Sequence, residues 1–575
     1  MRIVRTITAS CIIALLAGCA SQQRVAEDAT APAEMADSNV VVTGKRVDEE
    51  VAAAGQHAQQ PQSNPYMGAP PPSPPPAPMG AIVTTAKRAQ ESRIGPCCYR
   101  VPPVVVAVDP GRERYVGEEV SPVHLVRAEP VSTFSVDVDT GAYANTRRFL
   151  TEGRMPPRDA VRSEELINYF RYDYPLPDSR STPFSITTDV AVTPWNPKTR
   201  LMRIGLRGYD LPRSSRPPAN LVFLVDVSGS MSSQDKLPLV KTALSGLARE
   251  LGKQDRVSIV VYAGAAGQVL EPTNDERKIR AALDRLQAGG STAGAAGLKL
   301  AYNIARDNFI DGGVNRILIA TDGDFNVGVS DTKSLIEMIE HERENGITLT
   351  TLGFGTGNYN EAMMEQIADH GNGNYAYIDS ALEAKKVLGE QMSSTLFTIA
   401  KDVKIQVEFN PAQVSQYRLL GYENRALREE DFDNDLVDAG DIGAGHQVTA
   451  IYEIVPTGEK GWIGPRRYED PLPEAAQSKS RELAHVKLRY KLPDGKVSRL
   501  IERTVPASAM YTRQAMPSDF AFAAAVAAFG QTLRSDEMMN GFTYSQIAAL
   551  ASGHRDFWRQ EFVRLVGVAD SLKGG

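Results

Sequence analysis

Residues 220–230 read Asn-Leu-Val-Phe-Leu-Val-Asp-Val-Ser-Gly-Ser, and this stretch decides the fold class. Its five consecutive apolar residues, 221–225, are typical of a strand buried on both faces, as the strands of parallel sheets are. The apolar run ends at a carboxylate, Asp226, and two hydroxyl side chains, Ser228 and Ser230, follow it. Open α/β sheets bind ligands at the carboxyl ends of their strands, so this pattern predicts a site here.

The chain after this strand alternates between helical and extended patterns. Apolar residues recur at steps of three and four over residues 237–251, which predicts an amphipathic helix. Similar patterns predict helices over residues 279–286, 293–308, 335–344 and 360–370 and from 382, and strands over 257–262, 316–321, 347–354 and 375–378. This alternation predicts an α/β domain over residues 216–397, with a doubly wound, mostly parallel sheet.

Two more polar loops are expected at the same edge of this sheet. Thr292 closes a Gly-Gly-Ser-Thr loop that opens a helix, and Asp322 follows the strand over residues 316–321. Because parallel strands end at one edge, we expect these side chains to converge with those after the first strand. Hard oxygen donors suit Mg²⁺ or Mn²⁺ rather than Zn²⁺. The sequence predicts a metal centre with five contributors: Asp226, Ser228, Ser230, Thr292 and Asp322.

These five residues, in this order, resemble the metal-ion-dependent adhesion site of von Willebrand factor type A domains. Each element alone is common, since Gly-Ser-Thr is an ordinary helix start and Thr-Asp-Gly an ordinary turn. The resemblance implies that the hydroxyls bind the metal and that the aspartates act mainly through water. It also implies that a Glu or Asp of a protein partner completes the coordination. We expect a docking module and no enzyme, because no general base accompanies an activated nucleophile.

A wider resemblance covers the flanks of this domain. Residues 135–140 and 162–174 upstream, and 420–425 and 438–446 downstream, are similar to regions of bacterial lipoproteins that carry a central type A domain. Alternating patterns predict strands on both sides, over residues 184–193, 201–208, 403–409, 448–455, 484–490 and 497–505. We expect an N-terminal region, 131–215, and a C-terminal region, 398–575, to form one β-sandwich with the α/β domain inserted. Ala-rich helices over residues 519–533 and 543–552 should pack on it.

The N-terminus has the character of a targeting segment. A basic start and an apolar run over residues 7–16 lead to Leu-Ala-Gly-Cys, which resembles the bacterial lipobox. The resemblance implies a signal peptide, 1–18, and lipidation of Cys19, and the lack of an Asp after the cysteine favours the outer membrane, facing the periplasm or the surface. Nine of the 36 prolines lie in residues 61–78, so residues 19–130 are expected to be an extended, disordered linker.

Composition excludes several classes of protein. A chain of 575 residues is too long for one hydrophobic core. Its 63 basic and 70 acidic side chains give a net charge of −7, which argues against nucleic-acid binding. Four cysteines exclude a disulfide-dense scaffold. Cys97 and Cys98 are adjacent, and free thiols, a strained local disulfide and an intermolecular bridge all stay open.

A short acidic motif upstream of the α/β domain allows two interpretations. Residues 134–140 read Phe-Ser-Val-Asp-Val-Asp-Thr. The order Asp137, Asp139, Thr140 resembles the motif of haloacid-dehalogenase-type phosphatases, which implies a nucleophile at Asp137 and an acid/base at Asp139. The next α/β pattern begins only at residue 220, so we favour an Asx or N-cap turn that starts a helix over residues 143–150.

The remaining aromatic and histidine residues favour structural roles. Tyr169, Tyr172, Tyr174 and Trp195 are expected to pack in a core, with carbohydrate stacking as the alternative. His446 and His485 are expected to be core or surface residues and not ligands. The function predicted from the sequence is a lipid-anchored envelope protein that binds an acidic protein partner through its metal centre. The alternatives are a structural envelope protein without metal-dependent binding and, third, a phosphatase.

Overall fold

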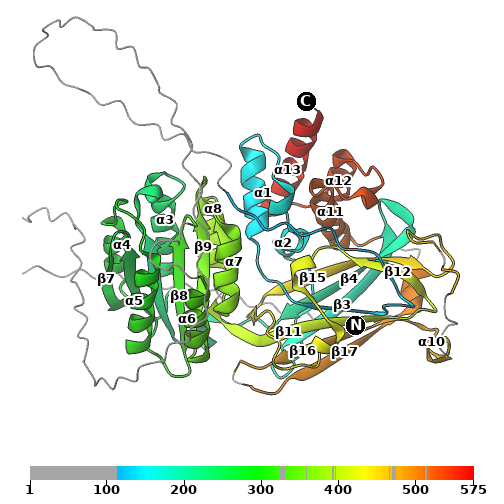
Figure 1. The fold of residues 1–575 in the computed structure, drawn as a ribbon, viewed down its shortest axis with the longest axis horizontal. Coiled ribbons are helices and arrows are strands. Elements are labelled where there is room, and N and C mark those ends of the chain that lie inside the picture. Colours follow the sequence, from blue (N-terminus) through cyan, green and yellow to red (C-terminus); the bar gives the residue numbers. More distant parts are fainter. Residues whose placement is uncertain are drawn as a thin grey trace, which may run out of the picture. The chain divides into compact units, whose positions relative to one another are not determined.

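Three β-sheets organise the described part of the chain (Figure 1). The computed structural model describes residues 113–323, 332–357, 359–391, 394, 396–464, 466–468, 474–493, 495–511 and 515–574. One sheet is mostly parallel and lies within the α/β domain. The other two are antiparallel and combine strands from both sides of that domain, which confirms the predicted insertion.

The sheet of the α/β domain has the strand order β10-β9-β8-β5-β6-β7. Its strands are β5 (Ala219–Asp226), β6 (Arg256–Tyr262), β7 (Ala266–Thr273), β8 (Val314–Thr321), β9 (Ile347–Phe354) and β10 (Tyr375–Ile378). All neighbours are parallel except β7, which pairs antiparallel with β6 at the edge. Every residue of β5 is buried, as its apolar run predicts.

Helices cover both faces of this sheet and account for the continuous apolar run of β5 (Figure 1). Leu221 and Phe223 pack in the cluster of α3 (Leu237–Ala248), α4 (Glu276–Asp284) and α8 (Ala381–Lys385). Val222 and Leu224 point to the other face, because successive side chains of a strand alternate. There they meet α5 (Gly294–Asp307), α6 (Thr332–Glu344) and α7 (Glu361–His370).

The two antiparallel sheets form the β-sandwich, here called the body. One sheet has the order β1-β12-β15-β4-β3, with β1 (His124–Leu125), β3 (Phe184–Thr193), β4 (Asn196–Gly208), β12 (Val414–Leu419) and β15 (Gln447–Pro456). The other has the order β13-β2-β11-β16-β17, with β2 (Val131–Ser135), β11 (Thr398–Phe409), β13 (Ala426–Leu427), β16 (Glu482–Lys491) and β17 (Arg499–Pro506); β14 (Ile442–Gly443) also pairs with β11.

Helices cover the outer face of the first of these sheets. They are α1 (Gly141–Thr151), α2 (Ser163–Asn168), α11 (Ser518–Leu533), α12 (Tyr544–Leu550) and α13 (Phe557–Gly574). The four predicted aromatic residues are all buried in their cluster: Tyr169, Tyr172, Tyr174 and Trp195. Core packing is therefore their role in this fold. Among the described residues, no helix is both long enough and apolar enough to cross a bilayer.

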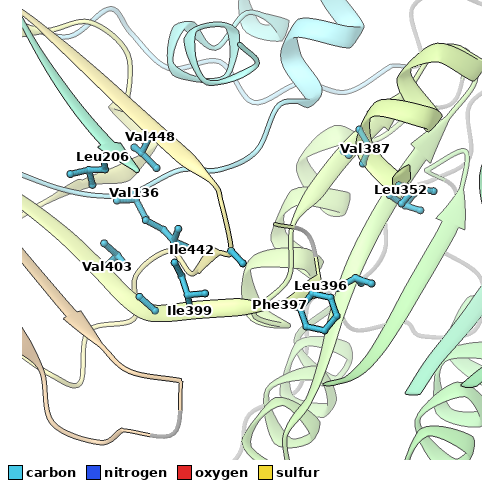
Figure 2. Packing of buried hydrophobic residues seen from close by; sticks show 14 of the residues in the cluster. Val136, Leu206, Leu352, Val387, Leu396, Phe397, Ile399, Val403, Ile442 and Val448 are labelled. Atoms are coloured by element: carbon cyan, nitrogen blue, oxygen red, sulfur yellow. The ribbon is translucent and has the colours of Figure 1, made fainter. Parts of the chain in front are cut away.

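The body and the α/β domain share one hydrophobic cluster (Figure 2). Leu396 and Phe397 lie where the chain leaves the α/β domain and enters β11. Buried residues continue from Leu352 in β9 to Ile399 and Val403 in β11. This continuity explains how the body supports the inserted domain without a separate linker.

The predicted linker boundary at residue 130 is too late. Strand β1 pairs with β12, and the Arg114 amide donates to the carbonyl of Tyr359 at 3.0 Å. The Glu113 carboxylate accepts hydrogen bonds from Arg148 at 2.9 Å and from the Gly357 amide at 3.1 Å. Residues 113–130 carry no periodic apolar pattern. These polar and backbone contacts hold them on the folded chain, together with Val126, which is fully buried in the hydrophobic cluster. The rest of the predicted linker and signal peptide lies outside the described residues.

Candidate metal centre

The carboxyl ends of β5 and β8 bring the predicted metal-binding residues into one place. Asp226 is the last residue of β5 and is fully buried. Its Oδ1 accepts the amide of Ser228 at 2.8 Å, and its Oδ2 accepts the hydroxyl of Thr321 at 3.0 Å. Asp226 therefore fixes the loop after β5 against the end of β8.

The two serines of this loop form a hydroxyl pair at the edge of the sheet. Their Oγ atoms lie 3.0 Å apart. Ser228 is buried, whereas Ser230 is exposed. The pair thus extends from the buried strand end to the surface, where a partner can reach it.

The glycine-containing loop before α5 is hydrogen-bonded directly to the serine loop. The Gly229 amide donates to the carbonyl of Gly290 at 3.0 Å, and the Gly289 amide donates to the carbonyl of Val227 at 2.8 Å. Gly290 has a φ of +86°, a conformation that suits glycine. The chain then reaches Thr292, which is buried. These two hydrogen bonds bring the loop before α5 and the serine loop together, as the sequence predicts.

Asp322 completes the predicted set and has a partner that the sequence analysis missed. Its side chain is fully buried, and its Oδ2 accepts a hydrogen bond from Lys236 Nζ at 2.8 Å. Its Oδ1 is buried and has no hydrogen-bond partner among the described residues. Lys236 directly precedes α3, and no local pattern distinguishes it from an ordinary surface lysine at a helix start.

Burial and mutual repulsion act on the carboxylates of the site. Burial raises the pKa of Asp226 to about 6, and the charge of Asp322 adds to this rise. Hydrogen bonds from Ser228 and Thr321 oppose it because they stabilise the charged form. A nearby divalent cation would stabilise the same charged form.

The chemistry of the donors fits Mg²⁺ or Mn²⁺. The site offers two carboxylates and three hydroxyls, all hard oxygen donors. The free Oδ1 of Asp322 is a buried acceptor of the kind that a cation or its bound water satisfies. Among the described residues, no group of three or more His, Cys, Asp or Glu side chains is placed to hold a metal. A metal at this candidate centre would therefore rely on the hydroxyl ligands beside the two aspartates.

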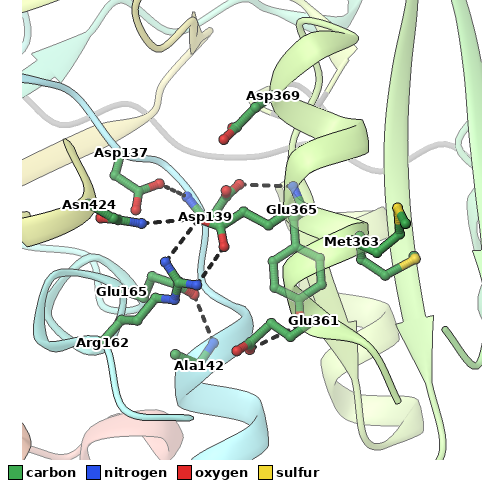
Figure 3. A network of polar contacts seen from close by, with 12 residues as sticks. Asp137, Asp139, Ala142, Arg162, Glu165, Glu361, Met363, Glu365, Asp369 and Asn424 are labelled. Carbon is green, nitrogen blue, oxygen red and sulfur yellow. Dashed lines mark hydrogen bonds and ion pairs between the residues drawn. The ribbon is translucent and has the colours of Figure 1, made fainter. Parts of the chain in front are cut away.

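The two aspartates of the phosphatase-like motif lie elsewhere, in a buried polar cluster (Figure 3). Asp137 accepts the amide of Asp139 at 2.9 Å, which confirms the predicted Asx turn. Asp139 accepts the amide of Tyr375 at 2.8 Å. The N-cap of α1 differs from the prediction, because Glu165 of α2 accepts the Ala142 amide at 2.8 Å while Thr140 makes no cap. Asp139 thus connects the body to the α/β domain, whereas the partners of Asp137 lie within the body.

The remaining candidate residues occupy structural positions or lie outside the described residues. His446 is half-buried, and the loss of solvent around its ring lowers its pKa to about 3, so the ring is neutral. His485 Nε2 lies 3.1 Å from a carboxylate oxygen of Glu502. Cys19, Cys97 and Cys98 lie outside the described residues.

The fold and the arrangement of the site define the α/β domain as a von Willebrand factor type A domain. Residues 220–391 match the family of that description, and residues 109–203 match the family described as von Willebrand factor. Residues 394–572 match the family described as the C-terminal part of the uncharacterized protein YfbK. The uncharacterized protein YfbK of Escherichia coli K12 is 48% identical over 476 residues, which cover 81% of this chain and 82% of that protein. The chain therefore belongs to the YfbK family of bacterial type A proteins.

Two further comparisons concern proteins that are less similar. The uncharacterized protein sll0103 of Synechocystis is 31% identical over 244 residues, which cover 40% of this chain and 57% of that protein. A solved von Willebrand factor type A structure from Catenulispora acidiphila covers 70% of this chain and 90% of its own, at 17% identity and a TM-score of 0.38. Membership of the type A family places the chain among proteins that are mainly interaction modules.

Proposed function

We propose that this protein is a lipid-anchored scaffold or adhesion protein of the bacterial cell envelope. In this proposal its type A domain binds an acidic residue of a protein partner through Mg²⁺ or Mn²⁺. The proposal is supported by the contacts among the loops that carry these two carboxylates and three hydroxyls at one edge of the sheet. The family supports an interaction role.

Each residue of the site has a role in this proposal. Ser228, Ser230 and Thr292 would hold the metal through neutral hydroxyls, and Asp226 orients the serine loop. The bound metal would supply a positive charge that attracts a carboxylate. Ser230 is exposed, so the partner can approach from solvent. The neutral donors leave most of that charge available to the partner.

Metal binding is the first test of this function. The full-length chain is expected to bind Mg²⁺ or Mn²⁺ at one site in calorimetry, and Asp226→Ala is expected to weaken binding at least tenfold. The reason is that Asp226 positions Ser228 and Thr321 as well as contributing charge. Asp307→Ala removes an exposed carboxylate of the same domain and serves as the control. If the wild type binds neither metal, the result would favour the structural alternative, a protein that binds no partner through metal.

Partner capture is the second part of the same test. Envelope extracts passed over the immobilised chain should release the partner on chelation and rebind it when Mg²⁺ is restored. A partner retained equally in chelator would contradict the metal-bridged mechanism and leave the interaction role in place.

Lipid anchoring rests on the Leu-Ala-Gly-Cys motif and is tested separately. Cys19→Ser is expected to move the chain from the membrane fraction to the soluble fraction, because lipidation at several acyl groups is what holds such proteins. Cys97→Ser is the matched control and should remain in the membrane fraction. Separation of inner and outer membranes then tests the proposed outer-membrane location.

A further inference from the structure

A buried ion pair lies inside the proposed metal centre. Lys236 Nζ and Asp322 Oδ2 are 2.8 Å apart, and the two side chains are 8% and 0% exposed. Most lysines avoid burial, because removal of an ammonium group from water is costly unless it is paired. Lys236 is thus held in the site by the fold and is not a surface lysine that happens to reach Asp322.

The fold provides a slot for the stem of this lysine. A Cβ on Gly355, in the loop after β9, would collide with the Lys236 side chain. Gly355 has a φ of +72°, and its carbonyl accepts the hydroxyl of Tyr377 at 2.8 Å, which fixes the loop. The glycine therefore leaves the space that Lys236 fills. Three elements position the ammonium group: the start of α3, the end of β8 and this loop.

The charges of the site show what the lysine does. Among the described residues that this inference considers, Asp226 and Asp322 carry two negative charges when ionised, and Lys236 carries one positive charge. A divalent cation would bring the total from −1 to +1 with the lysine, but from −2 to 0 without it. Like charges a few ångströms apart repel each other, and the repulsion falls as their separation grows.

We propose that Lys236 is a built-in cation that weakens metal binding and makes the metal-loaded site net positive. The proposal rests on the proposed function, since it concerns the same metal centre. Without metal, the ammonium neutralises Asp322 and lets the domain fold around a buried carboxylate. With metal, the extra positive charge favours an acidic partner over a neutral one. Lys236 is a positioning and charge-setting residue, not a metal ligand.

The test measures metal affinity with the metal alone. In the full-length chain, Lys236→Met is expected to bind Mn²⁺ about tenfold more tightly than the wild type, because one repelling charge is gone. Lys236→Arg keeps the charge and should keep the weaker affinity. Lys299→Met removes an exposed lysine from the same domain and should change nothing.

A second variant and a second measurement guard against misfolding. Lys236→Gln removes the charge but retains a hydrogen-bond donor near Asp322, so it replaces the Met variant if that protein does not fold. The rise in melting temperature on adding Mn²⁺ should be larger in the neutral variants than in the wild type.

The outcomes separate this inference from the proposed function. Equal Mn²⁺ affinity in the wild type and both neutral variants would overturn the role of Lys236 while leaving the metal centre in place. Mn²⁺ binding in the neutral variants alone would support the inference, because it would show that the charge of Lys236 prevents metal binding in the wild type. A lack of binding in all of them would overturn the metal centre and this inference together.

Discussion

Arg418→Met is expected to lower the unfolding free energy of the body by about 3–5 kcal/mol. Arg418 in β12 is fully buried and pairs with Glu453 at 2.8 Å and Asp536 at 2.6 Å. Those carboxylates are 0% and 2% exposed. Methionine would fill much of the same volume but leave both carboxylates without their cation. A buried charge that loses its partner keeps its full desolvation cost, which is why the expected loss is large.

The position of this triad explains why the loss should affect the whole body. Glu453 lies in β15, next to β12, and Asp536 follows α11. Glu453 also accepts hydrogen bonds from Trp195 at 3.1 Å and from Thr199 at 2.7 Å. The triad therefore connects the sheet to the helices that cover it.

Tryptophan fluorescence during urea unfolding measures this prediction selectively. All three tryptophans lie outside the type A domain: Trp195, Trp462 and Trp558. The control is Arg428→Met, because Arg428 is 71% exposed and pairs with Glu430, which is 68% exposed, as well as with the largely buried Asp431. Such exposed pairs are worth about 0–1 kcal/mol. Similar losses in both variants would show that burial of the triad does not determine its importance.

The type A domain could be predicted from the sequence because the patterns that indicate it lie in short, continuous segments. The apolar run of β5 and the polar residues after it are adjacent in the chain, and the structure places them as predicted. The alternating strands and helices fix which ends of the strands share an edge. The convergence of Thr292 and Asp322 with the serines therefore followed from topology before any contact was known.

The missed features depend on contacts between distant residues. Arg418 meets Glu453 and Asp536 across 35 and 118 positions, and nothing near Arg418 indicates a buried cation. Lys236 meets Asp322 across 86 positions. Such pairs become visible only when the fold has placed both side chains. No periodic pattern encodes them.

Two missed elements have different causes. Edge strand β7 has no buried residue and is defined by its antiparallel pairing with β6, so its sequence lacks the apolar run of a central strand. Helix α13 carries buried residues at helical spacing, namely Phe562, Leu565, Val566 and Ala569. This helix could have been predicted from its sequence by the same periodicity that identified α3.

The polar cluster between α7 and the body has more carboxylates than cations (Figure 3). Its acidic members are Asp137, Asp139, Glu165, Glu361, Glu365 and Asp369, and its arginines are Arg162 and Arg425. Arg162 binds both oxygens of Glu365, at 3.0 and 2.6 Å. Burial raises the pKa of four of these carboxyl groups, and repulsion among the carboxylates adds to the rise: Asp139, Glu165, Glu361 and Glu365.

Glu361 is the member whose proton should matter most. It is fully buried at the start of α7, and one of its oxygens has no hydrogen-bond partner. Burial raises its pKa to about 8, with the charge of Glu365 adding to the rise and Arg162 opposing it. Burial likewise raises the pKa of Glu165 well above its usual range. The native cluster therefore holds protons that the unfolded chain has lost.

The sign of the pH dependence follows from this difference. Between pH about 4.5, the ordinary value for Glu, and pH about 8, the native chain binds the Glu361 proton more tightly than the unfolded chain does. The contribution of Glu361 to stability is present below this window and is lost as pH rises through it. Lys386 and His446 have lowered pKa values, because burial disfavours their charged forms, so they act in the opposite direction. A comparison with a Glu361 variant isolates the one group.

Glu361→Gln is expected to become more stable than the wild type as the pH is raised. Glutamine is neutral at every pH, so the stability difference between the two proteins should be smallest at pH 6 and should grow at each higher pH up to about pH 8. At pH 9 the variant should be more stable by about 3 kcal/mol, the scale of an uncompensated buried charge. Urea unfolding followed by far-ultraviolet circular dichroism at pH 6, 7, 8 and 9 measures the difference.

The matched control for this prediction is Glu344→Gln, which changes an exposed carboxylate near the end of α6. Its difference from the wild type should stay constant with pH, because its side chain is exposed to solvent in the native chain as it is in the unfolded chain. A pH-independent difference for Glu361→Gln would mean that Glu361 stays ionised in the native cluster. The two arginines would then neutralise the cluster more effectively than their number indicates. If the difference grows with pH, the proton on Glu361 stabilises the cluster through which the type A domain contacts the body at neutral pH.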